Sequence, residues 1–350
     1  MKNNFSLYVI LFLIFAIISC STIQENSNFG RTQFKIIDEI EPEIIPLAGE
    51  ISLRESEISG MCWYNNFLIL IPQYPNFLDS GENGIIFYIR KNEIYNFLFS
   101  KNINEISPKT FRINLSDLSE YLKSGSGFEA ISVINDKIYL SIESMNDEKM
   151  ESLLISGKID TTNFSISLDK NSLTKIPVSV DIYNLSCEAI ASKNGTIIPI
   201  YEANGKNVNP NTFVNIFKND LEISNKIDFP NVEYRITDAT EIDENGKFWT
   251  INYFFPKDEK KLKTATDKIF YNFGIGKTHQ NSKVVERIVE FEFKNDRIEL
   301  SDKSPIYLKL LKNDSRNWEG LVKLDEKGFL IITDTFPETI LAFIEYNFSK

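Results

Sequence analysis

Apolar and polar residues alternate along most of this chain, and the alternating runs come in pairs separated by a turn rich in Asn, Asp or Gly. A pair of this kind predicts a β-hairpin. Five segments follow the pattern: EISGMCWYNNFLILIPQY from Glu57, GFEAISVINDKIYLSIES from Gly127, SCEAIASKNGTIIPIYEA from Ser186, ITDATEIDENGKFWTINY from Ile236 and NWEGLVKLDEKGFLIITDT from Asn317. The chain is therefore predicted to be all-β and built from a repeated unit.

Polar residues stand at the same two places in each hairpin. The first strand begins with a polar residue that precedes a small or turn-tolerant one, at Ser59, Glu129, Glu188, Asp238 and Glu319. The second strand ends on another polar residue, at Gln73, Glu143, Glu202, Asn252 and Asp334. The two positions are 14 residues apart in the first four hairpins and 15 apart in the fifth. A shared offset of this kind indicates one structural repeat.

Further strand-like stretches follow each hairpin and complete units of four strands, such as GIIFYIRK and NFLFSKNI after the first. Four-stranded units repeated about an axis are the blades of a β-propeller, and we count five, with a six-bladed ring as the alternative. The fifth unit is one strand short, and Gln33–Ile40 is expected to supply it and close the ring. The polar, basic stretch Lys257–Lys283 is expected to be a loop on one rim.

In a propeller, the start of the first strand and the end of the second lie at the same mouth of the channel. The sequence therefore predicts an inner ring of Ser59, Glu129, Glu188, Asp238 and Glu319, with the second-strand residues around it. Converging carboxylates repel one another unless a cation binds or protons are retained. Oxygen ligands favour a hard cation, Ca²⁺ first and Mg²⁺ second. A purely structural ring remains the alternative.

Three arginines precede the anchors by three to five residues, at Arg54, Arg235 and Arg316. Loops that lead onto the inner strands open on the same rim as the acidic rings, so these guanidinium groups are expected to bind phosphate beside the metal. The alternative is that each is a solvated or salt-bridged surface residue.

The ring of acidic residues and Ser59 resembles the calcium site of the five-bladed soluble calcium-activated nucleotidases, or apyrases. The segments Trp318–Val322 and Ile332–Thr335 also resemble the esterase-like phytase family. This resemblance implies hydrolysis of a phosphoanhydride or phosphoester in a small nucleotide or phytate-like substrate. In that interpretation Glu143, Glu202 or Asp334 orients or deprotonates the attacking water. The alternative is a non-catalytic lipoprotein that binds a ligand or protein.

The N-terminus predicts a lipoprotein. Lys2 precedes an apolar run from Phe5 to Ile18, and Ser19-Cys20 follows, which is typical of a lipobox with Cys20 as the lipidated residue. We therefore expect a signal peptide over residues 1–19, a tether over 20–32 and the propeller over 33–350. The expected location is extracytoplasmic, on the outer membrane or cell surface rather than the inner membrane.

The overall charge limits the expected partners. A net charge of -11 argues against binding nucleic acid. The expected partners are the membrane, through the lipid, and a small phosphorylated substrate, with the chain acting as a monomer. Cys62 and Cys187 fall in non-adjacent units, so no disulfide is expected between them.

Overall fold

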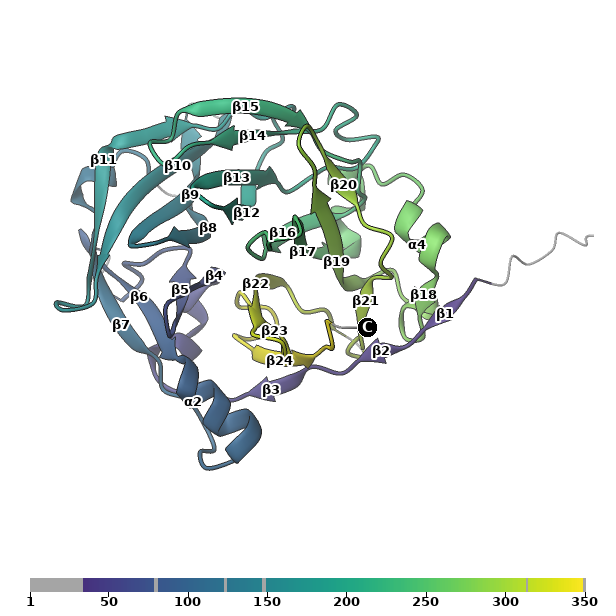
Figure 1. Ribbon diagram of the computed structural model, residues 1–350, viewed down its shortest axis with the longest axis horizontal. Helices are drawn as coiled ribbons and strands as arrows, with labels where there is room; N and C mark the ends of the chain where they lie inside the picture. The colour runs from purple at the N-terminus through teal and green to yellow at the C-terminus, as the bar shows by residue number, and fades with distance from the viewer. Residues whose placement is uncertain (1–33, 79–80, 123–124, 147–148, 313, 349–350) are drawn as a thin grey trace, which may run out of the picture. The chain divides into compact units, whose positions relative to one another are not determined.

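The computed structural model describes residues 34–78, 81–122, 125–146, 149–312 and 314–348. From Ile36 onward, these residues form one compact unit in which successive four-stranded units surround a central axis (Figure 1). The predicted β-propeller is confirmed, and the described residues contain five of these units. None of the described helices is long and apolar enough to cross a membrane. The predicted signal peptide, tether and Cys20 lie outside the described residues.

The five predicted hairpins form the inner half of each unit. They are β4 (Ile58–Tyr64) with β5 (Phe67–Pro72), β8 (Gly127–Ile134) with β9 (Lys137–Asn146), β12 (Cys187–Lys193) with β13 (Thr196–Tyr201), β16 (Arg235–Ala239) with β17 (Lys247–Phe254), and β22 (Trp318–Leu324) with β23 (Gly328–Thr333). Three of the turns place an asparagine at positive φ, with Asn65 at 53°, Asn135 at 56° and Asn194 at 46°. Asparagine tolerates this left-handed conformation, which two-residue hairpin turns require.

Outer strands complete each unit. They are β6 (Asn83–Arg90) and β7 (Lys109–Asn114), β10 (Lys149–Asp160) and β11 (Ser165–Lys175), β14 (Phe213–Phe217) and β15 (Ile223–Asp228), β19 (Val285–Phe293) with β20 (Ile298–Leu300) and β21 (Ile306–Leu308), and β24 (Leu341–Glu345). The predicted outer strand NFLFSKNI is instead mostly helical, because α2 (Lys91–Tyr95) continues into the π-helix η3 (Asn96–Ser100). Strand β7, further along the chain, takes its place beside β6.

Ring closure uses a later segment than the sequence predicts. Strand β3 (Glu43–Ile45) pairs antiparallel with β24 and supplies the fourth strand of the last unit. The predicted closing segment instead contributes β1 (Ile36–Ile37), which pairs with β18 (Ile275–Gly276), and β2 (Glu39–Ile40), which pairs with β21 of the fourth unit. The prediction of Gln33–Ile40 as the closing strand is therefore wrong in position. The chain must pass the edge of the fourth unit before it reaches the fifth, where Ile45 becomes buried.

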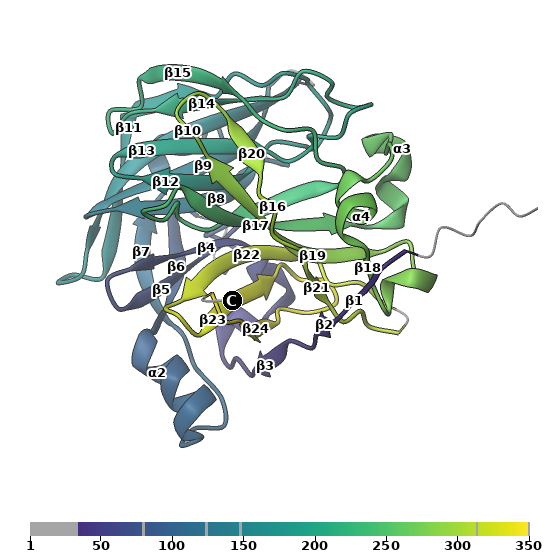
Figure 2. The same ribbon diagram turned by 45° about the vertical axis from the view of Figure 1, so that its right-hand side comes forward.

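The predicted rim loop contains regular structure. It includes η5 (Pro256–Asp258), α3 (Glu259–Leu262), α4 (Lys268–Phe273) and η6 (His279–Asn281). Figure 2 shows α3 and α4 at one side of the propeller. The side chain of Leu262 is buried, and Arg287 of β19 forms an ion pair with Asp267 at 2.7 Å. The insertion is thus fastened to the fourth unit.

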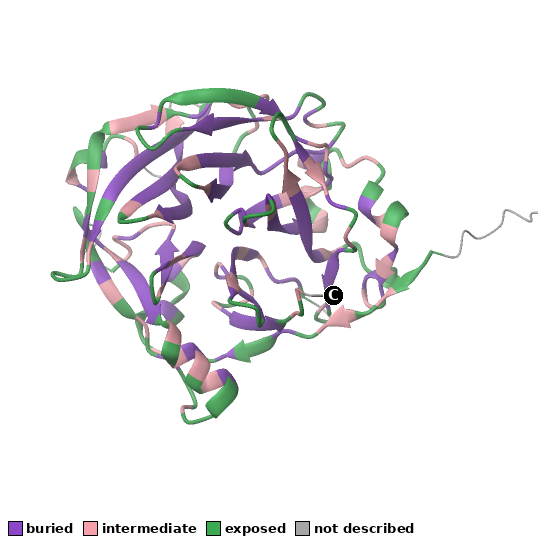
Figure 3. Ribbon diagram, in the orientation of Figure 1, coloured by how far each residue is buried: buried purple, intermediate pink, exposed green. Residues whose placement is uncertain are grey.

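Burial follows the distance from the axis. The inner strands are largely buried and the outer strands and turns more exposed (Figure 3). Large apolar side chains fill the spaces between neighbouring units; Trp249, Trp318 and Phe329, for example, pack together between the fourth and fifth. Burial of such side chains contributes about 1.5–3 kcal/mol each, which holds the mouths of the propeller in a defined geometry.

Candidate functional site

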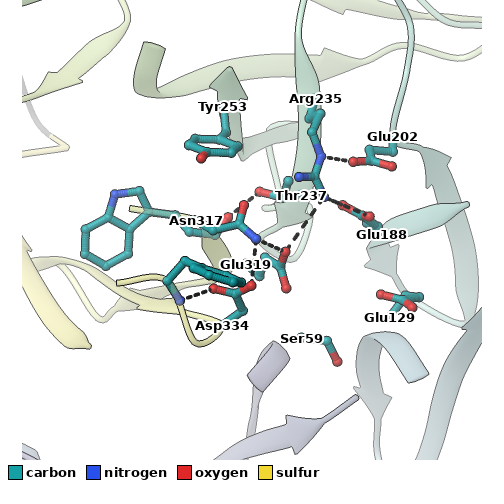
Figure 4. A network of polar contacts seen from close by, with 12 residues as sticks. Ser59, Glu129, Glu188, Glu202, Arg235, Thr237, Tyr253, Asn317, Glu319 and Asp334 are labelled. Carbon is teal, nitrogen blue, oxygen red and sulfur yellow. Dashed lines mark hydrogen bonds and ion pairs between the residues drawn. The ribbon is translucent and has the colours of Figure 1, made fainter. Parts of the chain in front are cut away.

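A β-bulge lies at the start of every inner strand and turns one side chain toward the axis. The pairing register shifts around Ser59 in β4, Glu129 in β8, Glu188 in β12, Thr237 in β16 and Glu319 in β22. A bulge leaves one residue unpaired and re-aims its side chain. Figure 4 shows these five side chains around the mouth of the propeller. Four of these five residues are predicted anchors, and the exception is Thr237 of the fourth unit.

The fourth unit is one residue out of the predicted register. The bulged residue is Thr237, and Asp238 pairs with Ile251 on the neighbouring strand. The end of the second strand lies one residue later than predicted, because Arg235, two residues before the bulge, pairs with Tyr253. Thr237 and Tyr253 therefore occupy the positions that the sequence analysis assigned to Asp238 and Asn252.

Asp238 lies at a different place. Its buried carboxylate accepts hydrogen bonds from the backbone N–H groups of Leu321, at 2.6 Å, and Ala239, at 2.8 Å. It thereby joins the inner strands of the fourth and fifth units. Burial raises the pKa of Asp238 well above its usual range, although these backbone donors oppose the rise. The geometry gives Asp238 a structural contact and removes it from the predicted ring.

Arg235 lies among the acidic side chains (Figure 4). Its Nε donates to Glu202, and its Nη2 is 3.1 Å from both carboxylate oxygens of Glu188. The same Nη2 is 3.7 Å from Glu319 Oε1. One guanidinium group thus binds carboxylates of the third and fifth units. Because Glu202 is fully buried, this contact supplies a counter-charge that water cannot.

Two amides bind other acidic groups of the mouth. Gln73 Nε2 donates to Glu129 Oε1 at 2.8 Å. Asn317 Nδ2 donates to Glu319 and, at 2.9 Å, to Asp334 Oδ2. Asp334 also accepts from a backbone N–H in the following turn. The polar network therefore extends around the mouth, with Arg235 as the cation inside it.

The carboxyl groups of this mouth resist ionisation. Burial raises the pKa values of Glu129 and Glu319 well above their usual range, and neighbouring carboxylates add to the rise. Burial also raises the pKa of Glu188, although Arg235 opposes it. For Glu143, burial and the nearby Glu188 raise the pKa to about 7. The cluster must retain protons or acquire positive charge near neutral pH.

The three predicted phosphate-binding arginines do not gather at one place. Only Arg235 enters the acidic ring. Arg54 is exposed and lies over the ring of Phe336, with 4.8 Å between its Cζ and the ring centroid. Arg316 is buried and binds Glu286, at 2.7 Å from Nη2 to Oε2, and the backbone oxygen of Lys309. A buried carboxylate of β19 therefore binds Arg316, and phosphate binding by Arg54 and Arg316 stays a prediction.

The donor chemistry of the ring is suited to Ca²⁺, since every inner side chain offers oxygen. Two buried acceptors, Glu202 Oε2 and Asn317 Oδ1, also have no hydrogen-bond partner among the described residues. Among the described residues, however, no three His, Cys, Asp or Glu side chains are arranged to hold a metal ion. Arg235 lies between Glu188 and Glu319. Calcium binding stays a prediction.

A cleft of about 500 Å³ lies beside the ring, between it and the insertion. Arg235 and Tyr253 line it from the propeller, and Lys257 and Lys261 line it from the insertion. Lys261 is close enough to lower the pKa values of Glu143 and Glu188 by its charge, against the larger effect of their burial. The site therefore combines an acidic ring with a cleft that contains cationic side chains.

Sequence reasoning missed four members of this site: Thr237, Tyr253, Asn317 and Lys261. A signal for Thr237 was present, because each bulged residue follows an apolar one, as Thr237 follows Ile236. Alignment on this apolar neighbour would have corrected the fourth unit. No local pattern indicated that Lys261 would reach the mouth.

The remaining two cysteines in the described region behave as predicted. Cys62 and Cys187 are both buried and free. The predicted absence of a disulfide between them is confirmed. Burial raises the pKa of the Cys187 thiol to about 12, so the thiol is protonated and unreactive near neutral pH.

No family model matches the sequence, and no curated protein matches it. Solved structures do match. An exo-1,5-α-L-arabinanase from a bovine ruminal metagenomic library is 7% identical with a TM-score of 0.45, and covers 90% of this chain and 97% of its own. A GH43_1 enzyme from Xanthomonas citri is 8% identical with a TM-score of 0.45, and covers 86% and 90%. A glucose dehydrogenase is 7% identical with a TM-score of 0.43, and covers 85% and 99%.

These likenesses do not identify an activity for this chain. The TM-scores are below 0.5 and the identities are 7% to 8%, so these matches carry no argument about this chain. The β-propeller is shown by the pairing of its own strands. The resemblance to nucleotidases and to the esterase-like phytase family stays a prediction. Function must be argued from the side chains at the mouth.

Proposed function

We propose that this mouth is the active site of a hydrolase that cleaves a phosphoester or phosphoanhydride bond at an extracytoplasmic membrane surface. One observation carries the proposal: the mouth gathers Glu129, Glu188, Glu202 and Glu319 around the single guanidinium of Arg235. A phosphorylated substrate also needs cations, and the adjoining cleft supplies Lys257 and Lys261 beside that same arginine. Acidic and basic groups are thus available at one place.

Among the three predicted catalytic residues, Glu143 is the best candidate for handling a water molecule. Arg235 binds Glu202, and Asn317 binds Asp334. Among the described residues, no arginine and no backbone N–H donates a hydrogen bond to Glu143, and the polar side chain beside it is the hydroxyl of Ser186, which lowers its pKa. A carboxylate free of such contacts can orient a water molecule and accept its proton. Glu202 and Asp334 are then positioning residues that hold Arg235 and Asn317.

Calcium remains the cation we propose for the ring. When bound, Ca²⁺ would polarise a phosphoryl oxygen and help neutralise the carboxylates. The oxygens of Glu129, Glu188 and Glu319 would hold it, with the unpartnered Glu202 Oε2 nearby. Lipidation at Cys20 would keep the propeller at a membrane surface.

The test is a panel of nucleotides and phosphomonoesters incubated with the purified protein in Ca²⁺, in Mg²⁺ or in chelator. We expect turnover that requires a divalent cation and falls at least tenfold in Glu143→Gln. Glu326→Gln is the matched control, because this exposed residue lies in the β22–β23 turn at the opposite end of the hairpin. Absence of turnover across the panel in all three conditions would favour the alternative, a lipoprotein that binds a ligand without catalysis.

A further inference from the structure

The insertion between β17 and β19 carries two lysines with unusual surroundings. Lys257 and Lys261 line the cleft beside the ring, and neither forms an ion pair with a described carboxylate. The Lys261 ammonium has one polar contact, at 3.4 Å to the backbone oxygen of Asn184. Lys257 lies over the ring of Phe255, with 5.5 Å between its Nζ and the ring centroid. Both ammonium groups can therefore receive an anion.

The lysines on the solvent side of the same insertion are different. Lys283 pairs with Glu259 at 3.1 Å, and both side chains are exposed. Lys260 is next to Lys261 in α3, but it is exposed and does not line the cleft. Lys257 is also exposed and Lys261 is half-buried, but both of these lysines line the cleft, whereas Lys260 and Lys283 do not. This difference provides matched controls within one short segment.

Arg235 faces the same cleft. Its Nε and Nη2 bind the carboxylates of the ring, whereas its Nη1 forms no hydrogen bond to any described residue. A guanidinium group can hold a carboxylate with one edge and an incoming anion with the other. Two carboxylates, Asp258 and Asp314, also line the cleft. An anion must therefore bind close to the cationic groups to avoid repulsion.

We propose that the insertion is an anion clamp, in which Lys257 and Lys261 bind the phosphate of the substrate together with Nη1 of Arg235. This inference rests on the proposed function, and it assigns substrate affinity to a segment outside the β-propeller repeat. The clamp selects substrates that carry at least two adjacent negative charges, because separate cationic side chains converge on one cleft. Lys257 and Lys261 are specificity residues, and the chemical step belongs to the ring.

The direct test is calorimetric titration of the metal-free protein with inorganic pyrophosphate at pH 7. We expect wild type to bind, Lys261→Met to bind at least tenfold more weakly, and the Lys257→Met, Lys261→Met double variant to bind more weakly still. Lys261→Arg should restore most of the affinity, because it restores the cation. Lys260→Met and Lys283→Met should bind as wild type does. All variants should share the wild-type melting temperature, since neither clamp lysine forms an ion pair.

The hydrolysis panel separates the clamp from the proposed function. If wild type turns over a substrate, Lys261→Met should raise KM at least tenfold. It should change kcat by a smaller factor, through the loss of a charge that lowers the pKa of Glu143. Turnover together with unchanged pyrophosphate affinity in Lys261→Met would overturn the clamp and leave the hydrolase standing. Turnover by a wild-type protein that does not bind pyrophosphate would likewise overturn the clamp and leave the hydrolase standing. Pyrophosphate binding that depends on Lys261, without turnover of any substrate, would support the clamp and contradict the hydrolase.

Discussion

Arg235 offers the most demanding test of how the acidic mouth is stabilised, through the substitution Arg235→Met. Methionine keeps much of the side-chain length and removes the charge. The variant leaves Glu202, which is fully buried, and Glu188 without the guanidinium that binds them. Removal of one partner from a buried ion pair costs about 3–5 kcal/mol, because the other charge stays buried. A destabilisation of that size is expected here.

The loss should depend on pH in a defined direction. Without Arg235, the pKa of Glu188 in the folded protein rises further above its ordinary value of 4.5. A carboxyl group with a raised folded pKa binds more protons in the folded state, so stability falls as the pH rises above 4.5. The difference between variant and wild type should therefore be largest near pH 8 and smallest near pH 5.

The assay is thermal unfolding in chelator at both pH values. Since about 1 kcal/mol shifts the melting temperature by roughly 2–4 °C in domains somewhat smaller than this one, a loss of at least roughly 6 °C is expected at pH 8. If the ring binds Ca²⁺, a free Ca²⁺ concentration of 100 times the Kd should raise the free energy of unfolding by about 2.7 kcal/mol. Arg54→Met is the control, because Arg54 is exposed and should change stability by less than about 0.5 kcal/mol. A variant that melts with wild type at pH 8 would refute the counter-ion role of Arg235.

Three further predictions follow from the fold, the ring and the N-terminus. Glu129→Gln keeps the acceptor for Gln73 and removes an ionisable group whose pKa is raised in the folded protein. It should therefore stabilise the metal-free protein at pH 8, by about 1.4 kcal/mol for each unit by which that pKa exceeds 4.5. A pH-stability curve that matches wild type would contradict this. Ile45→Ala in the closing strand should lower the free energy of unfolding in urea by about 2–5 kcal/mol, because Ile45 is 1% exposed. Ile36→Ala should lower it by less than about 0.5 kcal/mol, because Ile36 is 49% exposed. Equal losses would show that ring closure does not depend on β3. Cys20→Ser should abolish metabolic fatty-acid labelling, and undiminished labelling would disprove lipidation at Cys20.

Much of the fold was predictable from the sequence because its signals are local. Alternation over a few residues specifies a strand, and Asn65, Asn135 and Asn194 specify turns at positive φ. The hairpins were therefore found within a residue or two. The helical segment Asn96–Ser100 was misassigned, since a short apolar run with aromatic residues suits a strand or a buried helix equally well.

The candidate site was predicted less completely. Ser59, Glu129, Glu188 and Glu319 were assigned correctly to one mouth, because a repeated position in the sequence becomes a repeated position in space. Asp238 was not, since it and Thr237 are adjacent polar residues and only the pairing of β16 with β17 decides which one is bulged. Spacing along the chain carries no information about a bulge in one hairpin.

The sequence by itself determined five hairpins, a propeller and a mouth rich in carboxylates. The tertiary structure alone decided which cation enters that mouth. Arg54, Arg235 and Arg316 look alike in the sequence, yet Arg316 binds the buried Glu286, Arg54 lies over Phe336, and Arg235 reaches Glu188 and Glu202. Arg235 and Arg316 bind the buried carboxylates that folding brings within their reach, because an unpaired buried charge is costly. Arg54 is exposed and needs no such partner. Those partners come from strands distant in the sequence, so only the assembled propeller determines them.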